Sequence, residues 1–164
     1  MPPDLSADYG WAVAALDAML ERVFGEFEPP RPMSIGEWAE TYRILSREES
    51  NDYAGPYELE NTPALRGILA ECDPKRNRRV AVQKSAQLGY TAGIVCNVIG
   101  YHVHWEPCVQ VVMFPREKSA KDFDAEKFSP MVRATPALAK CIRLKSRTDG
   151  NSTTRKHYPG GLAK

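Results

Sequence analysis

The stretch Arg78–Gly100, RRVAVQKSAQLGYTAGIVCNVIG, decides how the rest of the sequence is interpreted. An apolar run typical of a strand precedes a turn-forming segment, and an apolar run typical of a helix follows it. This order is that of a phosphate-binding loop, whose usual pattern is G-x-x-x-x-G-K-[ST]. Gly89 and Thr91 stand in register with that pattern. Lys84, however, occupies the place of its first glycine, and Tyr90 occupies the place of its lysine.

Lys84 is a candidate for a displaced loop lysine. In such a loop, backbone N–H groups point at a phosphate and one cation neutralises the terminal phosphates. Because the loop wraps around the phosphate, its two ends lie near each other, and the flexible stem of Lys84 can reach the same region. Gly89 would let the backbone approach closely, and Thr91 would offer its hydroxyl to Mg²⁺. The alternative is a glycine turn with an exposed lysine, since K-x-x-x-x-G-x-[ST] occurs by chance in about one chain in ten.

Composition is typical of an ordinary globular domain. The chain has 164 residues, of which 43% are hydrophobic and 26% charged, so one domain with a modest core is expected. The net charge of +1 does not by itself point to nucleic acid or acidic lipid. No apolar run reaches the roughly 18 residues of a membrane span, and no signal peptide is evident. The four widely spaced cysteines fit no metal pattern and are expected to be reduced thiols, mostly in the core.

Three helices are predicted before the loop. Ala7–Phe27 is amphipathic, and the proline-rich segment Glu28–Pro32 sets it apart. The sequence Ser-Ile-Gly-Glu at 34–37 is a capping box, which predicts a helix over Ile35–Ile44. A third helix is expected to begin after Thr62 as N-cap, with Pro63 in the first position, and to end near Cys72.

Strands and helices are predicted to alternate from the loop onward, which favours an α/β fold with a parallel sheet. The expected strands are Val80–Val82, Cys108–Pro115 and a possible third, Cys141–Lys145; the expected helices are Thr91–His104 and Arg116–Phe128. The polar end of the chain is expected to form turns. The carboxylates of Asp122, Asp124 and Glu126 are interpreted as a solvated helix face. The fold class is therefore a P-loop NTPase-like parallel sheet with flanking helices, incomplete because only its first strands are visible, preceded by an amphipathic helix.

Five stretches, in order, carry a family resemblance. They are SIGEWAETYRILSREES (34–50), GPYELENTPALRGIL (55–69), VQKSAQLGYTAG (82–93), FSPMVRATPAL (128–138) and YPGG (158–161). From about Pro32 to Gly161 the sequence resembles the lambda-type (GpA) large subunit of tailed-phage terminase, an ATP-driven DNA-packaging motor and nuclease. The family's variant loop begins with its lysine, as K-S-A-x-x-G-Y-[ST] does here.

The resemblance implies a site for ATP and Mg²⁺. Lys84 would contact the β and γ phosphates, and Thr91 would contact Mg²⁺. Loop backbone amides would cradle the phosphates; they belong to Ser85, Ala86, Gln87, Leu88, Gly89 and Tyr90. Gln87 would approach the γ-phosphate, with a solvent-facing loop residue as the alternative. An upstream aromatic residue would support the adenine: Tyr53, or alternatively Tyr57, with ordinary loop packing left open for both.

The resemblance also implies two parts. Residues 1–30, the helix and its tether, would bind the small terminase subunit, or else the helix packs on its own domain. Residues 31–164 would be the N-terminal part of the P-loop ATPase domain, truncated before the Walker B acids, which are expected after Tyr158–Gly161. ATP binding without efficient hydrolysis is therefore expected of this fragment.

The parent function that the resemblance implies is packaging of viral double-stranded DNA into the procapsid through the portal, with endonuclease activity. The expected location is the bacterial host cytoplasm, with no membrane partner. One alternative is a non-catalytic interaction module with a relic loop. Another is a DNA-binding protein that uses the basic cluster Lys75–Arg79.

Overall fold

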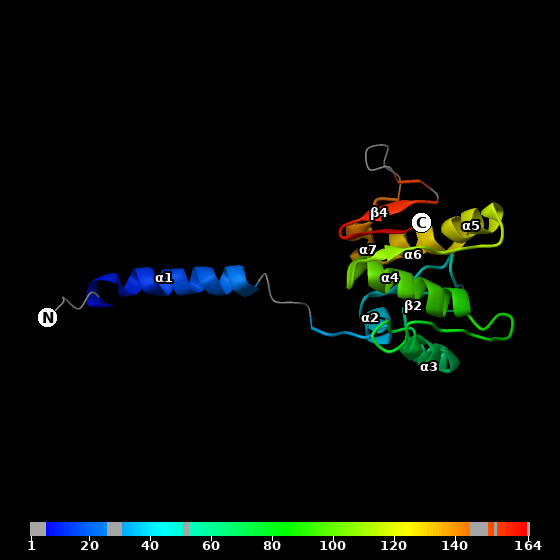
Figure 1. The fold of residues 1–164 in the computed structure, drawn as a ribbon, viewed down its shortest axis with the longest axis horizontal. Helices are drawn as coiled ribbons and strands as arrows, with labels where there is room; N and C mark the ends of the chain where they lie inside the picture. The colour runs from blue at the N-terminus through cyan, green and yellow to red at the C-terminus, as the bar shows by residue number, and fades with distance from the viewer. Residues whose placement is uncertain (1–5, 26–30, 51–52, 145–150, 153, 164) are drawn as a thin grey trace. The chain divides into compact units, whose positions relative to one another are not determined.

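The computed structural model describes residues 6–25, 31–50, 53–144, 151–152 and 154–163. The chain separates into two units, Met1–Pro32 and Met33–Lys164 (Figure 1). The first contains helix α1 (Ser6–Gly25), which confirms the expected helix as far as Gly25, whereas residues 26–27 at its expected end and residues 28–30 of the tether lie outside the described residues. Large apolar side chains of α1 are exposed: Trp11, Val13, Leu16, Met19, Leu20, Val23 and Phe24.

The second unit begins with two helices and a short antiparallel strand pair between them. Its first elements are helix α2 (Ile35–Tyr42), strands β1 (Ile44–Leu45) and β2 (Gly55–Pro56), the 3-10 turn η1 (Leu59–Asn61) and helix α3 (Pro63–Glu71). The capping box is confirmed, because the Ser34 hydroxyl accepts from the Glu37 N–H at 3.2 Å and Glu37 Oε2 accepts from the Ser34 N–H at 2.8 Å. Thr62 stands at the N-cap of α3 and Pro63 follows it, but the Thr62 side chain makes no capping hydrogen bond.

A long helix follows the loop and begins with a wide turn. The remaining elements are the π-helix η2 (Thr91–Val95), α4 (Cys96–His104), β3 (Val109–Gln110), α5 (Glu117–Phe123), the π-helix η3 (Asp124–Phe128), α6 (Ser129–Ala134), α7 (Pro136–Cys141), β4 (Lys156–Tyr158) and β5 (Gly161–Ala163). Together η2 and α4 confirm the helix that was expected from Thr91 to His104. The charged helix expected over Arg116–Phe128 is formed by α5 and η3.

The strands make small sheets. β1 and β2 pair antiparallel, while β3, β5 and β4 form a mixed sheet in that order, with β3 parallel and β4 antiparallel to β5. The fold is therefore mixed α/β, as expected at that level. Of the strand expected over Cys108–Pro115, only Val109–Gln110 is paired.

Two predicted strands are wrong. Residues 80–82 form no strand and Val80 is 39% exposed, because none of the described residues supplies a neighbouring ladder. At Cys141–Lys145, helix α7 runs through Cys141 and residues 142–144 form no strand, while Lys145 lies outside the described residues. The strand signal was misplaced, since β4 and β5 lie in the segment that was expected to form turns.

The core lies around α4, which contacts α2 and α7 (Figure 1). Trp38 of α2 is fully buried against Gly100 of α4, where an added Cβ would lie 2.3 Å from the indole ring. Glycine at this position therefore lets the two helices approach closely. Among the described residues, none of the helices combines the length and apolar character needed to cross a bilayer.

Candidate functional site

A cavity of about 850 Å³ lies beside the loop. Its volume falls within the range of ligand pockets, roughly 300–1,000 Å³. Most of the predicted loop residues line it, together with both candidate tyrosines: Lys84, Gln87, Leu88, Gly89, Tyr90, Thr91, Tyr53 and Tyr57. Ser85 and Ala86 are exposed but are not among its lining residues. The structure thus brings together side chains that are far apart in the sequence.

The loop turns sharply before the helix. Gln87 has φ of +57° and Gly89 has φ of +73°, so two left-handed residues stand close together. A left-handed conformation is uncommon for a residue such as glutamine. Turns that include left-handed residues can point successive backbone N–H groups into a shared concavity that binds anions. The Gly89 carbonyl then accepts from the Gly93 N–H at 2.7 Å, which ties the turn to the helix.

Lys84 lies against the residue that replaces the usual loop lysine. Its Nζ is 5.6 Å from the centroid of the Tyr90 ring and donates to the Ser85 carbonyl at 3.2 Å. A cation over an aromatic face is attracted by about 0.5–1 kcal/mol at an exposed site. Tyr90 therefore keeps the Lys84 ammonium near the loop.

The two tyrosines differ in burial. Tyr53 is 52% exposed, whereas Tyr57 is only 4% exposed and its ring is covered by the Arg43 guanidinium, with 5.4 Å from Cζ to the ring centroid. Tyr53 can therefore offer a ring face to a ligand, while Tyr57 is a core residue. Within the described residues, the hydroxyls of Tyr57 and Thr62 are buried without a hydrogen-bond partner.

A buried polar network lies behind the loop helix, and sequence reasoning missed it. Arg43 Nη2 contacts Glu49 Oε1 at 2.8 Å, with both side chains 0% exposed. Arg43 Nη1 donates to the Ala92 carbonyl and to Asn97 Oδ1, and Asn97 Nδ2 donates to the Gly93 carbonyl at 2.8 Å. Both carbonyls belong to η2, where the wide π-turn changes the usual helical pairing. The network therefore fixes the first turn of the loop helix.

Glu49 and Lys127 form the wall beside this network. Glu49 Oε2 accepts from the Ser46 backbone N–H at 3.2 Å, so both carboxylate oxygens are used. Lys127 Nζ donates to the Glu49 carbonyl at 3.3 Å and also lines the cavity. Sequence reasoning missed Lys127 because it lies on a segment that read as a charged, solvated helix.

Thr91 is the candidate protein ligand for Mg²⁺ at this cavity. The described residues contain no group of three His, Cys, Asp or Glu side chains that could bind a metal ion. Thr91 is exposed and lines the cavity at the start of the helix, so its hydroxyl is free to contact an ion. A bound nucleotide and water would supply further oxygen ligands.

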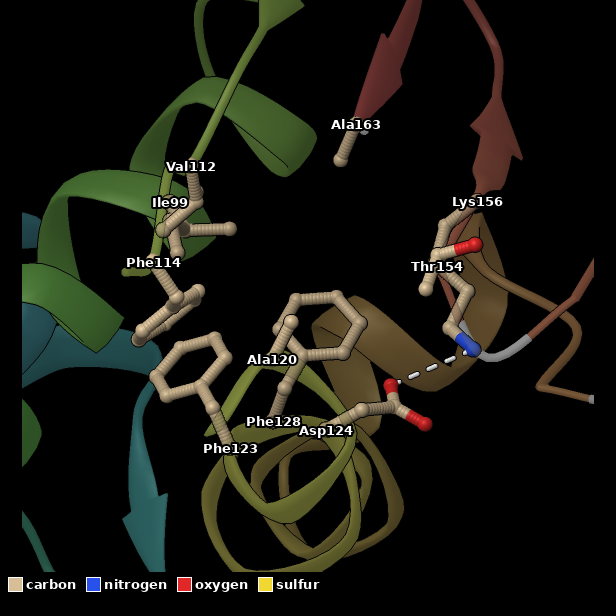
Figure 2. Close-up of a pocket in the computed structure, with 10 residues that line it drawn as sticks. All are labelled: Ile99, Val112, Phe114, Ala120, Phe123, Asp124, Phe128, Thr154, Lys156 and Ala163. Atoms are coloured by element: carbon tan, nitrogen blue, oxygen red, sulfur yellow. Dashed lines mark ion pairs between the residues drawn. The ribbon is translucent and has the colours of Figure 1, made fainter. Parts of the chain in front are cut away.

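The prediction that Asp124 is a solvated carboxylate is wrong. Its Oδ1 lies 3.2 Å from Lys156 Nζ, and the side chains are 15% and 6% exposed. The pair stands at the rim of a second, apolar cavity of about 80 Å³, into which Phe123 and Phe128 project (Figure 2). Asp122 and Glu126 are exposed, as expected. The ion pair therefore ties η3 to strand β4.

The basic cluster is partly neutralised. Lys75 Nζ lies 2.7 Å from Glu106 Oε1, and Arg76 Nη2 lies 3.3 Å from Glu71 Oε1. The hydrogen bond from Lys75 lowers the pKa of the Glu106 carboxyl. Arg78 and Arg79 are exposed. These pairs weaken the hypothesis of a DNA-binding surface at 75–79.

Comparison with known proteins gives two matches. A sequence model of the family described as "Phage terminase large subunit gpA, ATPase domain" matches residues 51–164. The "Terminase, large subunit" of Enterobacteria phage P21 is 26% identical over 134 residues, which is 81% of this chain and 20% of that protein. No solved structure matches. This chain spans about a fifth of the length of that relative. It belongs to the family of gpA-type phage terminase large subunits, matched over the ATPase domain.

Proposed function

We propose that residues 31–164 form the loop half of an ATP site in a P-loop NTPase-like domain, and that this site serves ATP-driven packaging of viral DNA. The observation that carries the proposal is the convergence of Lys84, Thr91 and Tyr53 on one cavity, around a turn with two left-handed residues. Membership in the terminase family supports the same function.

Each part of the site has a proposed role. Backbone amides of residues 85–90 bind the phosphates, since Gly89 has no side chain to hinder the approach. Lys84 leaves the Tyr90 ring and pairs with the terminal phosphates, which offer a full negative charge in place of an aromatic face. Thr91 contacts Mg²⁺, and the exposed Tyr53 ring stacks on adenine. When bound, Mg²⁺ would neutralise part of the phosphate charge.

Hydrolysis requires a group that orients or activates water. Two carboxylates line the cavity among the described residues, those of Glu49 and Glu58. Glu49 is bound to Arg43 and Ser46, and Glu58 Oε2 accepts from Asn61 Nδ2 at 3.4 Å. We therefore propose that this chain binds ATP without hydrolysing it efficiently, and that Walker B acids and the endonuclease belong to other parts of the full terminase.

A calorimetric titration of Mg-ATP into the protein tests this function. Replacing Lys84 by Ala removes a charged partner of the phosphates and should weaken binding about tenfold or more. Lys118→Ala is the matched control, because Lys118 is exposed on α5 and does not line the cavity. Absence of binding, or equal binding by wild type and the Lys84 variant, would contradict the proposal and favour a relic loop.

A second function rests on α1. Its apolar side chains at Val13, Leu16 and Leu20 are 55%, 55% and 40% exposed, which is the kind of stripe that binds a partner helix. We propose that it docks the terminase small subunit in the host cytoplasm, while the full motor acts at the portal of the procapsid on double-stranded DNA. Deletion of residues 1–30 should abolish capture of the small subunit and leave Mg-ATP affinity unchanged. Retained capture would contradict this role.

A further inference from the structure

A second lysine reaches the loop cavity from a distant element. Lys127 belongs to η3 (Asp124–Phe128) and lines the same cavity as Lys84 and Thr91. We propose that Lys127 is a second cation for the phosphate chain of the bound nucleotide. This inference rests on the proposed function, because it assigns a further residue to the same ATP site.

Lys127 has unused donor capacity. An ammonium group offers three N–H donors. Among the described residues, Lys127 Nζ makes one hydrogen bond, to the Glu49 carbonyl at 3.3 Å, and no ion pair. Neighbouring lysines are different: Lys121 pairs with Glu117 at 2.8 Å, and Lys156 pairs with Asp124. The half-buried Lys127 is thus held at the cavity wall with its charge uncompensated.

The surrounding charges favour an anion at this wall. The Glu49 carboxylate, which lines the cavity, is compensated by Arg43 at 2.8 Å, so this pair contributes little net charge. The other lining carboxylate, Glu58, is exposed and hydrogen-bonded to Asn61. Lys84 and Lys127 are therefore the uncompensated cations among the described lining residues, and they approach the cavity from two different elements.

The segment that carries Lys127 is anchored on its other side. Phe128 is 5% exposed and points, with Asp124, toward the apolar cavity (Figure 2). The Asp124–Lys156 ion pair fixes the start of η3, and Phe128 fixes its end. Because both ends of η3 are fixed, the backbone that carries Lys127 loses little further freedom when the ammonium binds a phosphate.

The test measures competition against a fluorescent ATP analogue with Mg²⁺ present. Two competitors separate the ends of the nucleotide: inorganic triphosphate and adenosine. Lys127→Met removes the charge, Lys127→Gln also removes it but keeps a donor for the Glu49 carbonyl, and Lys127→Arg keeps the charge. We expect both neutral variants to weaken ATP and triphosphate about tenfold, and the Arg variant to stay within about threefold of wild type. Adenosine competition should not change.

Lys121→Met is the control, since Lys121 lies on the same helical stretch but does not line the cavity. If the Lys84 variant loses triphosphate binding while Lys127→Gln keeps it, the inference is overturned and the ATP site stands. Equal loss of adenosine and triphosphate in the Gln variant would also overturn it, because that pattern indicates a packing role. If wild type binds no nucleotide, both the function and this inference fall.

Discussion

Around the loop helix the chain buries its side chains, whereas in and after strand β3 it leaves several large apolar side chains exposed. Trp38, which faces Gly100 of α4, and Leu65, which faces Gly93 of η2, are both 0% exposed. Val109, Val111 and Met113, in and after β3, are 71%, 65% and 88% exposed. Helices bury an apolar stripe against neighbours supplied nearby in the chain, but a strand needs ladders on its edges and cover on its faces. The helices on the loop side therefore bury their apolar side chains, whereas the strand on the sheet side is covered only in part.

The hydrogen-bonded partners of the two regions also differ. On the loop side, Arg43 unites Glu49 and Asn97 with the carbonyls of η2. On the sheet side, and among the residues that the structure describes, β3 and β5 pair at two positions, Val109 with Leu162 and Gln110 with Ala163. Substitutions should therefore be costly behind the loop and tolerated along the sheet.

The largest effect is expected when the buried ion pair is broken. Arg43→Met leaves the Glu49 carboxylate buried without its partner, which costs about 3–5 kcal/mol in the free energy of unfolding. The control is Arg133→Met, because the Arg133–Glu48 pair at 2.8 Å has side chains 54% and 65% exposed. An exposed pair contributes about 1 kcal/mol or less. Urea unfolding followed by circular dichroism measures both, and equal losses would remove the distinction between the two regions.

Two glycines on the loop side offer a second, smaller contrast. An added Cβ at Gly93 would lie 2.4 Å from Leu65 Cδ1, so Gly93→Ala should cost about 1–3 kcal/mol through overpacking. At Gly67, in α3, no atom lies within 4 Å of an added Cβ. Gly67→Ala should therefore stabilise the helix by about 0.5–1 kcal/mol. Thermal unfolding decides the signs; a neutral Gly93 variant would show that η2 can shift away from α3.

The helices on the loop side could be predicted because their signals are local. The capping box at Ser34 and the proline at position 63 specify helix starts within a few residues. Strands depend on distant partners, so the apolar runs at 80–82 and 108–115 gave one wrong strand and one that is far too long. The pairing of β3 with β5 joins residues 109 and 162, and no local sequence pattern predicts it.

The candidate site divides in the same way. A contiguous pattern identified the residues of the loop, and the structure places Lys84 and Gln87–Thr91 on one cavity. The sequence placed Tyr53 first and Tyr57 second as the residue that would support adenine; Tyr53 is 52% exposed, and Tyr57 is covered by Arg43. Lys127 comes from a distant element, so only the folded chain reveals it. The chemical roles of all these residues stay predictions.

A pH effect should also appear on the loop side. Burial raises the pKa of the Cys96 thiol from 9.0 to about 11, although Arg43 opposes the shift. Because the folded state holds this proton more tightly than the unfolded state, the contribution is fully present below pH 9 and is lost as pH rises toward 11. The expected loss is about 1–2 kcal/mol between pH 8.5 and 10.5. Urea unfolding of wild type and of Cys96→Ala at both pH values measures this loss. If the free energy of unfolding changed equally with pH in the two proteins, Cys96 would not be its source.

The smallest effect is expected on the sheet side. Val111 is 65% exposed, so the hydroxyl that Val111→Thr introduces would lie mainly in water. This substitution should change the free energy of unfolding by less than about 0.5 kcal/mol. The matched substitution in α4 is Val103→Thr, because Val103 is 1% exposed and its new hydroxyl would enter the core. Burying a hydroxyl without a partner costs about 1–3 kcal/mol. If Val111→Thr proved as costly as Val103→Thr, the apolar run after β3 would have to be covered in solution, and the contrast between the two regions would then reflect a missing neighbour and not a tolerant surface.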